Sequence, residues 1–219
     1  MRSARTRADI TQPGYHTGRV PSNKGKRYPV EVLTGEEVHA ILEAGGTTVY
    51  GIRNRALITV LYRAGLRISE ALALFPKDVD SAGCSIRVLH GKGDQARTVG
   101  IDPAALTVIS NWLALRERHG FGDTQPLFCT MTGRHIGGSY VRTLLPRLGR
   151  QVGITKRVHA HGFRHTHAYE LMMEGIAIGI IQRQLGHVSL ATTDIYLSHI
   201  APRQVIEAIA TRDWVIPTQ

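Results

Sequence analysis

The fold class is decided by one stretch of the sequence, residues 85–101, which reads SIRVLHGKGDQARTVGI. Its first part alternates apolar and polar residues and places Ile86 and Val88 on one face, as expected of a strand with one buried side. A glycine-rich turn separates it from a second strand-like run over 97–101, and this arrangement is typical of an antiparallel hairpin. The stretch therefore predicts a small antiparallel sheet.

Helical patterns lie on both sides of this hairpin. Thr34 followed by Glu36 and Glu37 is typical of a helix N-cap with acidic residues in the first turn. Apolar residues at helical spacing, bounded by Gly and Pro signals, predict helices over residues 34–44, 53–63, 68–74, 103–119, 137–152, 162–173, 176–185, 191–197 and 202–210, with one more short strand over 127–129. Strand and helix signals do not alternate, which disfavours a parallel βαβ sheet. The expected fold class is mainly α with a small antiparallel β-sheet (α+β).

The composition excludes several classes of protein. With 42% hydrophobic residues among 219, the chain can bury a core, which excludes wholesale disorder. Its two cysteines, Cys84 and Cys129, are too few for a disulfide framework or a thiolate zinc site and indicate a reducing compartment. No apolar run reaches the roughly 20 residues that span a bilayer. We therefore expect a soluble cytoplasmic protein with no membrane partner.

The formal net charge of +10 suggests a polyanionic partner, and most of the excess lies near the N-terminus. Residues 1–30 carry one acid, Asp9, and seven basic side chains. These are Arg2, Arg5, Arg7, Arg19, Lys24, Lys26 and Arg27. With interspersed Gly and Pro and no periodic apolar face, the segment is expected to be a flexible basic arm. It is either a solubilising tail or an arm that lies along phosphates and gains affinity by counterion release.

Two patterns in the first half of the chain carry candidate chemistry. In GLRISEAL, residues 65–72, Arg67 follows a glycine turn at a helix start, and Glu70 lies three residues on, where it can hold the guanidinium in place. Taken alone, such a pair is more often a surface salt bridge. The hairpin tip places Lys92 between two glycines but lacks the rest of a P-loop. Lys92 is therefore either a solvated turn residue or a lysine that reaches a substrate as a proton donor.

Two further patterns lie towards the C-terminus. The run HAHGFRHTH, residues 159–167, holds four histidines but neither the carboxylate nor the cysteine that a zinc site of this kind requires, so a metal site is disfavoured. His161 and Arg164 share a helix face and combine a titratable group with a bidentate cation. In LGHVSLATTDIY, residues 185–196, Tyr196 taken alone is typical of a packing residue. The order of the whole set is more informative than any single residue.

This set strongly resembles the tyrosine recombinase family, also called the phage integrase or XerC/XerD-like family. The resemblance covers roughly residues 33–200, the catalytic domain of the family, and rests on GLRISEAL, HGFRHTHA and LGHVSLATTDIY in the family's order and spacing. It implies a mainly helical fold with a three-stranded antiparallel sheet. It also implies six catalytic residues and one supporting acid. These are Arg67, Lys92, His161, Arg164, His187 and Tyr196, with Glu70 supporting the first arginine.

The resemblance further implies the chemistry. The two arginines would clamp the scissile phosphate, and His187 would add another donor. Tyr196 would attack phosphorus to form a 3′-phosphotyrosine, His161 would accept its proton or stabilise the pentavalent state, and Lys92 would protonate the leaving 5′-oxygen. The expected activity is site-specific recombination of double-stranded DNA with no cofactor, neither metal nor nucleotide. The alternatives are an enzyme that relaxes DNA by breaking and rejoining one strand, a DNA-binding relative without catalysis, and a zinc-dependent hydrolase built on the histidines.

The resemblance also implies a homo-oligomer, a tetramer, on paired DNA sites in the cytoplasm, associated with the nucleoid. Relatives usually carry a separate helical DNA-clamping domain, whereas only about 30 residues precede the first predicted helix, too few for a domain with its own core. We expect the arm or an accessory DNA-binding partner to replace that domain. The expected organisation is an arm over 1–30, a catalytic domain over 31–201, and a C-terminal helix or tail over 202–219 that packs back on the core or is exchanged between protomers.

Further DNA contacts are expected outside the catalytic set. The candidates are Arg19, Lys24, Lys26 and Arg27 in the arm and Arg97 in the folded part. For Arg97 and Arg134, the alternative to a phosphate contact is a solvated loop position. His167 stands where relatives often carry an aromatic residue, and with His165 it is expected to shape its helix rather than take part in the chemistry.

Overall fold

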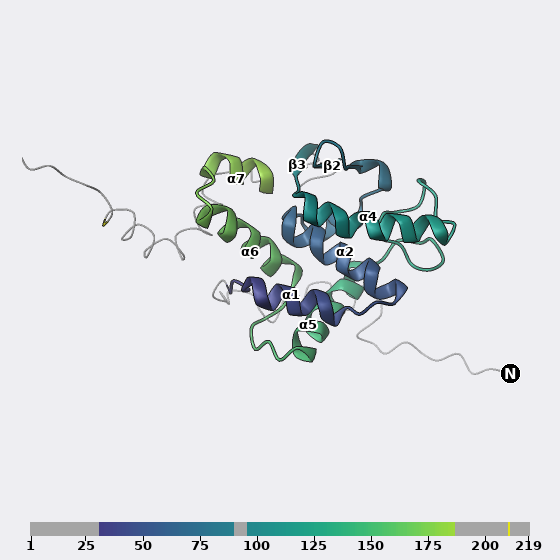
Figure 1. Ribbon diagram of the computed structural model, residues 1–219, viewed down its shortest axis with the longest axis horizontal. Coiled ribbons are helices and arrows are strands. Elements are labelled where there is room, and N and C mark those ends of the chain that lie inside the picture. The colour runs from purple at the N-terminus through teal and green to yellow at the C-terminus, as the bar shows by residue number, and fades with distance from the viewer. Residues whose placement is uncertain (1–30, 90–95, 187–209, 211–219) are drawn as a thin grey trace, which may run out of the picture.

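The computed structural model describes residues 31–89, 96–186 and 210, and Figure 1 shows helices packed around a central helix with a small sheet at one side. The helices are α1 (Gly35–Ala44), α2 (Val49–Arg63), α3 (Ile68–Leu72), α4 (Pro103–Arg118), α5 (Gly138–Gln151), α6 (Ala160–Met173) and α7 (Ile178–Leu185). The strands are β1 (Val79–Asp80), β2 (Ser85–Val88) and β3 (Arg97–Gly100), and a short 3₁₀ turn, η2 (Pro76–Asp78), precedes β1. The expected class, mainly α with a small antiparallel sheet, is confirmed.

The sheet has the order β1-β2-β3, and both pairs are antiparallel. Its register places Ile86 opposite Val99 and Val88 opposite Arg97. Ile86, Val88 and Val99 are buried, as the alternation in the sequence predicts. Residues opposite one another project from the same face of a sheet, so Arg97 directs its side chain toward the buried side.

The central element is α2, which contacts α1, α3, α4 and α6 (Figure 1). It contributes Leu57, Ile58 and Leu61 to the core, all fully buried. The helix begins four residues before the predicted start at residue 53, because the side chain of Thr48 accepts a hydrogen bond from the N–H of Gly51 and caps it there. Packing of these side chains holds α2 in place, and the chain that follows the C-terminal end of α2 leads directly into the candidate site.

The predicted strand over 127–129 is wrong. The three residues are fully buried, but within the described chain only Cys129 pairs in β fashion, through a single antiparallel bridge to His135. The carbonyl of Leu127 accepts a hydrogen bond from the indole of Trp112 at 2.7 Å instead. The apolar run is therefore a buried connection, whereas the unpredicted β1 is only two residues long.

Most predicted helix boundaries differ from the structure by one or two residues. The helix α6 begins at Ala160 because the side chain of His159 caps it, and α7 begins at Ile178. The predicted break after α2 is confirmed by Gly65, whose φ of 62° is left-handed. The predicted helix over 191–197, the arm and most of the C-terminal tail lie outside the described residues. Within the described part of the chain, no helix combines the length and apolar content needed to cross a bilayer.

Candidate active site

Arg67 lies immediately before α3, where a buried carboxylate holds it. Glu70 accepts hydrogen bonds from the Arg67 backbone N–H at 2.9 Å and from Nη1 of its guanidinium at 2.7 Å. The predicted pair is therefore present, and it is not an ordinary surface salt bridge, because the Glu70 side chain is only 1% exposed. Glu70 therefore holds both the backbone and the guanidinium of Arg67.

A second arginine shares the same carboxylate. Arg97 donates from Nη1 and Nη2 to the two oxygens of Glu70, at 3.0 and 2.9 Å, in a bidentate pair. Its side chain is 14% exposed, so the solvated loop position that was the alternative to a phosphate contact for Arg97 is wrong. Burial alone would raise the pKa of Glu70, but hydrogen bonds from Arg97 and Arg67 outweigh burial and lower the pKa to about 2. Glu70 is therefore ionised at neutral pH.

The other predicted phosphate ligand, Arg164, projects from α6 and is 1% exposed. Its Nη1 donates to the carbonyl of Gly65 at 2.6 Å, and its Nη2 donates to the carbonyl of Leu185 at 2.5 Å. Gly65 precedes Arg67 by two residues in the chain. Arg164 is thus hydrogen-bonded to the segment that carries the first arginine.

Both arginines are held by the C-terminal end of α7. The carbonyl of Leu185 accepts from Arg164, and the next carbonyl, that of Gly186, accepts from Nη2 of Arg67 at 3.3 Å. Carbonyls at a helix C-terminus have no partner within the helix and carry partial negative charge, so they favour cations. Two arginines that lie 97 positions apart in the sequence therefore converge on one turn of the chain.

Gln184 fixes this turn against the sheet. Its side-chain oxygen accepts from the N–H of Gly100 at 2.9 Å, and its amide nitrogen donates to the carbonyl of Gly100 at 2.8 Å. The end of α7 is thereby attached to the end of β3, the strand that begins with Arg97. The position of the carbonyls that hold the arginines is therefore set by two hydrogen bonds to the backbone of the sheet.

His161 lies beside the two arginines, at the surface of α6. Protein surrounding the inner side of the ring partly desolvates it, and the positive charges of Arg164 and Arg67 add to this effect, so its pKa is lowered to about 4. The imidazole is therefore neutral at pH 7 and has one nitrogen able to accept a proton. A phosphate bound between the arginines would oppose their effect and raise the pKa of His161.

The histidine run has no metal-binding geometry in the described residues. His159 caps α6 by accepting from the N–H of Gly162, and the rings of His161 and His165 lie edge to face with centroids 4.3 Å apart. No group of three His, Cys, Asp or Glu side chains in the described ranges is arranged to hold an ion. In these described contacts the histidines cap a helix and pack ring against ring.

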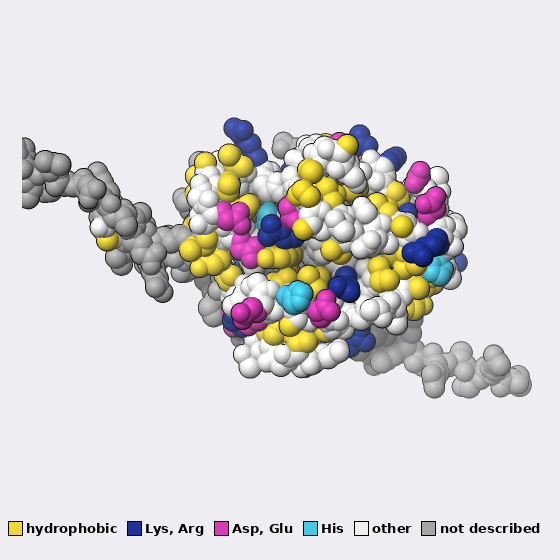
Figure 2. Space-filling view, in the orientation of Figure 1, with side chains coloured by type: hydrophobic (Ala, Val, Ile, Leu, Met, Phe, Trp, Pro, Cys, Tyr) yellow, Lys and Arg dark blue, Asp and Glu magenta, His cyan; other side chains and the backbone are white. Residues whose placement is uncertain are grey.

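His167 is 4% exposed and lines a cavity of about 230 Å³ between α6, α7 and the end of β3. Burial, followed by the charges of Arg63 and Arg164, lowers its pKa to about 4. Arg63 in turn pairs with Asp102 at 2.7 Å and with Glu170 at 3.3 Å. Figure 2 shows charged side chains of both signs on the face where α6 and α4 lie on either side of α2. His167 is thus a neutral, buried packing group beside the ion pairs that Arg63 forms with Asp102 and Glu170.

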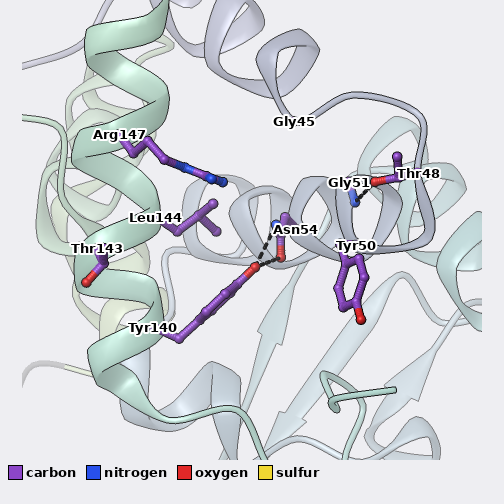
Figure 3. Close-up of a pocket in the computed structure, with 9 residues that line it drawn as sticks. All are labelled: Gly45, Thr48, Tyr50, Gly51, Asn54, Tyr140, Thr143, Leu144 and Arg147. Atoms are coloured by element: carbon purple, nitrogen blue, oxygen red, sulfur yellow. Dashed lines mark hydrogen bonds between the residues drawn. The ribbon is translucent and has the colours of Figure 1, made fainter. Parts of the chain in front are cut away.

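A larger cavity, of about 410 Å³, lies between α5 and the connection from α1 to α2 (Figure 3). At its base the hydroxyl of Tyr140 accepts hydrogen bonds from Arg53 at 2.7 Å and Asn54 at 3.0 Å. Tyr50 and Arg147 lie on either side of it. This cavity contains none of the predicted site residues, so the candidate site is the cluster of Arg67, Glu70, Arg97 and Arg164 at the C-terminal end of α7.

The structure brings together four residues of the predicted set, namely Arg67, Glu70, His161 and Arg164. The other three, Lys92, His187 and Tyr196, lie outside the described residues. Two features of the site were not predicted from the sequence: the bidentate pairing of Arg97 with Glu70, and the two carbonyls at the end of α7. The alternation in β3 could have indicated the burial of Arg97, because Arg97 precedes the buried Val99 by two residues and side chains two apart in a strand lie on the same face.

A mainly helical domain with a three-stranded antiparallel sheet, in which two arginines converge on one helix end with a histidine beside them, is of the class of integrase-like catalytic domains. Comparison with known proteins makes this specific. Residues 31–202 match the sequence model of the phage integrase family, and the chain belongs to that family.

Relatives with assigned names agree with this placement. The chain is 32% identical over 194 residues to tyrosine recombinase XerC of Thermodesulfovibrio yellowstonii, which covers 86% of this chain and 64% of that protein. It is 32% identical over 203 residues to tyrosine recombinase XerD of Bifidobacterium longum, covering 88% of this chain and 65% of that protein. The chain thus spans slightly less than two thirds of the length of these relatives.

Solved structures show the same fold. The crystal structure of XerA recombinase aligns with a TM-score of 0.74 and 30% identity, over 91% of this chain and 72% of that one. The XerH site-specific recombinase, solved bound to a palindromic difH substrate as a post-cleavage complex, aligns with a TM-score of 0.69 and 29% identity, over 83% of this chain and 53% of that one. The fold expected from the resemblance is therefore confirmed.

Proposed function

We propose that the protein is a site-specific DNA recombinase that cleaves and rejoins DNA through a covalent 3′-phosphotyrosine intermediate. The observation that carries this proposal is the convergence of Arg67 and Arg164 on consecutive carbonyls of α7, with His161 beside them. The XerH relative, crystallised with its DNA substrate after cleavage, is a recombinase of the same fold. This likeness supports DNA as the substrate of the present chain.

The charge of the cluster suits a phosphodiester. Arg67, Arg97 and Arg164 contribute three positive charges and Glu70 one negative charge, which leaves a formal charge of +2 to meet a phosphate. As phosphorus becomes pentavalent, negative charge accumulates on the non-bridging oxygens. Guanidinium groups that are already oriented by the protein stabilise that charge without reorganising during the reaction.

The proton transfers follow from the same arrangement. Tyr196 attacks phosphorus, so that a bond forms between its phenolic oxygen and phosphorus while the bond from phosphorus to the 5′-oxygen breaks. Neutral His161 accepts the phenolic proton, and Lys92 donates a proton to the 5′-oxygen as it leaves. His187 adds a hydrogen bond to the phosphate. Because the phosphotyrosine retains the phosphodiester bond energy, the reverse attack by a 5′-hydroxyl rejoins the strand without ATP.

The wider organisation is part of the proposal. The substrate is double-stranded DNA with specific sites, bound by a homotetramer on the nucleoid in the cytoplasm. The catalytic domain over residues 31–201 makes the covalent intermediate, the basic arm over 1–30 or an accessory protein adds DNA contacts, and the tail over 202–219 connects protomers. Lys24 and Lys26 are among the arm residues that we expect to contact phosphates.

The test is covalent capture on DNA. Random-sequence duplexes enriched by binding to the full chain supply the site, which is then made as a duplex nicked next to the cleavage point so that the adduct accumulates. We expect an adduct with the wild-type protein and none with Tyr196→Phe, which should still bind the duplex. Tyr50→Phe is the matched control, since Tyr50 is exposed and lies outside the site, and it should react normally.

Two results would contradict the proposal. An adduct formed by Tyr196→Phe would remove the assigned nucleophile. Relaxation of a supercoiled plasmid that lacks paired sites, at a rate equal to cleavage of the selected duplex, would favour the strand-relaxing enzyme instead.

A further inference from the structure

Arg97 belongs to the cluster and contributes to its charge, but none of the proposed chemical steps assigns it a role of its own. It donates two hydrogen bonds to Glu70, which itself accepts two from Arg67. It also packs against Gly186, where an added Cβ would lie 2.6 Å from the Nε atom of Arg97. Arg97 therefore contacts both groups that orient Arg67, the carboxylate on one side and the chain at the end of α7 on the other.

The charges explain why two arginines share one carboxylate. A buried Glu70 paired with Arg67 alone would form a neutral unit, and its negative charge would weaken the attraction between Arg67 and a phosphate. Arg97 compensates that charge from the opposite side. Glu70 can then orient Arg67 through two hydrogen bonds while the cluster stays positive toward the substrate.

The partner of Arg97 argues against direct contact with DNA. Both terminal nitrogens of Arg97 donate to the buried carboxylate of Glu70, which neutralises its charge, whereas those of Arg164 donate to backbone carbonyls, which carry no net charge. A phosphate contact would require the bidentate pair to break and would leave Glu70 with less compensation in a buried position, which is costly.

We propose that Arg97 is a positioning residue for the phosphate-binding Arg67, which it holds in place and keeps electrostatically effective through Glu70. This inference rests on the proposed function, because it assigns Arg67 to the scissile phosphate. It predicts that loss of Arg97 slows DNA cleavage while leaving DNA binding unchanged.

The experiment compares five variants of the full chain with the wild type on the selected nicked duplex. Arg97→Gln removes the charge, and Arg97→Lys keeps the charge but loses the bidentate geometry. Glu70→Gln removes the carboxylate, and the double variant Arg97→Gln/Glu70→Gln removes both partners. Arg87→Gln is the matched control, since Arg87 lies on β2 and pairs with the buried Asp78 at 3.5 Å, outside the site. Thermal unfolding fixes a temperature at which every variant is folded.

The measured quantities are the single-turnover rate of adduct formation at saturating protein and the dissociation constant at several salt concentrations. We expect Arg97→Gln to lower the rate by about 10- to 100-fold with the dissociation constant changed less than about twofold. Arg97→Lys should recover part of the rate, and Arg87→Gln should react as the wild type. In the Glu70→Gln background, Arg97→Gln should change the rate by less than about threefold, because no carboxylate is left to compensate.

Three outcomes would overturn the inference. If Arg97→Gln weakens binding and lowers the slope of log affinity against log salt by about one, Arg97 contacts a phosphate directly. If Arg97→Gln lowers only the unfolding temperature and reacts at the wild-type rate when folded, its role is structural alone. A wild-type chain that forms no adduct overturns the proposed function itself, and with it the role of Arg97, which separates that failure from the other two.

Discussion

Replacing Gly65 with alanine changes the turn that joins the core to the candidate site, and the structure sets the size of the effect. Gly65 has a φ of 62°, a conformation that costs an alanine about 1 kcal/mol. An added Cβ would lie 2.6 Å from Cδ2 of His167 and 3.0 Å from Cδ2 of Leu185, whereas carbon atoms pack at about 3.5–4.0 Å. Because His167 is buried, relieving this overlap is expected to cost a further 1–3 kcal/mol or so.

The total expected loss is therefore about 2–4 kcal/mol, or roughly 5–15 °C in the unfolding temperature of a chain of this size. Gly175 offers a matched control. It also follows a helix in the left-handed region, with a φ of 78°, but an added Cβ there would meet nothing within 4 Å. Gly175→Ala should thus show only the conformational cost of about 1 kcal/mol.

The assay is urea unfolding of Gly65→Ala, Gly175→Ala and Gly65→Ala/His167→Ala, with His167→Ala as the reference for the double variant. Removing the ring should lower the cost of the alanine at position 65 toward that measured at position 175, and the remaining overlap with Leu185 should account for any difference. Equal losses for the two glycine variants, or an unchanged cost after removal of His167, would refute the overlap as the cause.

Two further predictions concern pH and the arm. The pKa of His167 is lowered from its ordinary value of 6.5 to about 4 in the folded state, so between these values the unfolded chain binds more protons than the folded one. The free energy of unfolding is therefore at its full value above pH 6.5 and falls as the pH drops toward 4. By linkage this loss is about 3 kcal/mol, and a pH titration of the unfolding free energy should show it in the wild type and not in His167→Gln; parallel curves would contradict it. Deleting residues 1–28 should weaken DNA binding and reduce its salt dependence, since the segment is strongly basic. Affinity and salt slope that are unchanged in a binding titration would make the arm a solubilising tail.

Local signals in the sequence predicted most of the fold. Alternation in β2 and β3, the cap at Thr34 and the break at Gly65 each depend on neighbours within a few residues, and each is present in the structure. The predictions that were wrong concern segments whose structure is decided by residues far away in the sequence. The apolar run over 127–129 has the composition of a strand, but whether it pairs is decided by what lies beside it in space, here Trp112 of α4.

In the candidate site, too, contacts between near neighbours in the sequence were predictable and contacts between distant residues were not. The pair of Arg67 with Glu70 spans three residues and was predictable from helical spacing. The pairing of Arg97 with Glu70 spans 27 residues and depends on where the fold places the start of β3 relative to α3. The sequence around Arg97 therefore suggested only a solvated or DNA-facing residue. Backbone carbonyls carry no signature in the sequence, which is why the contribution of Leu185 was not predicted.

The glycine of the LGH motif, Gly186, can nevertheless be explained from the structure. Its φ of 63° ends α7 at the position where the carbonyls of residues 185 and 186 face the two arginines. Any side chain there would be strained by the backbone conformation and would overlap the Nε, Cζ and Cδ atoms of Arg97. A glycine is therefore required for two independent reasons: it aims the carbonyls, and it leaves room for the arginine that compensates Glu70. The end of α7 and the pair of Arg97 with Glu70 are consequently one unit, because Gly186 both ends the helix and leaves space for the Arg97 side chain.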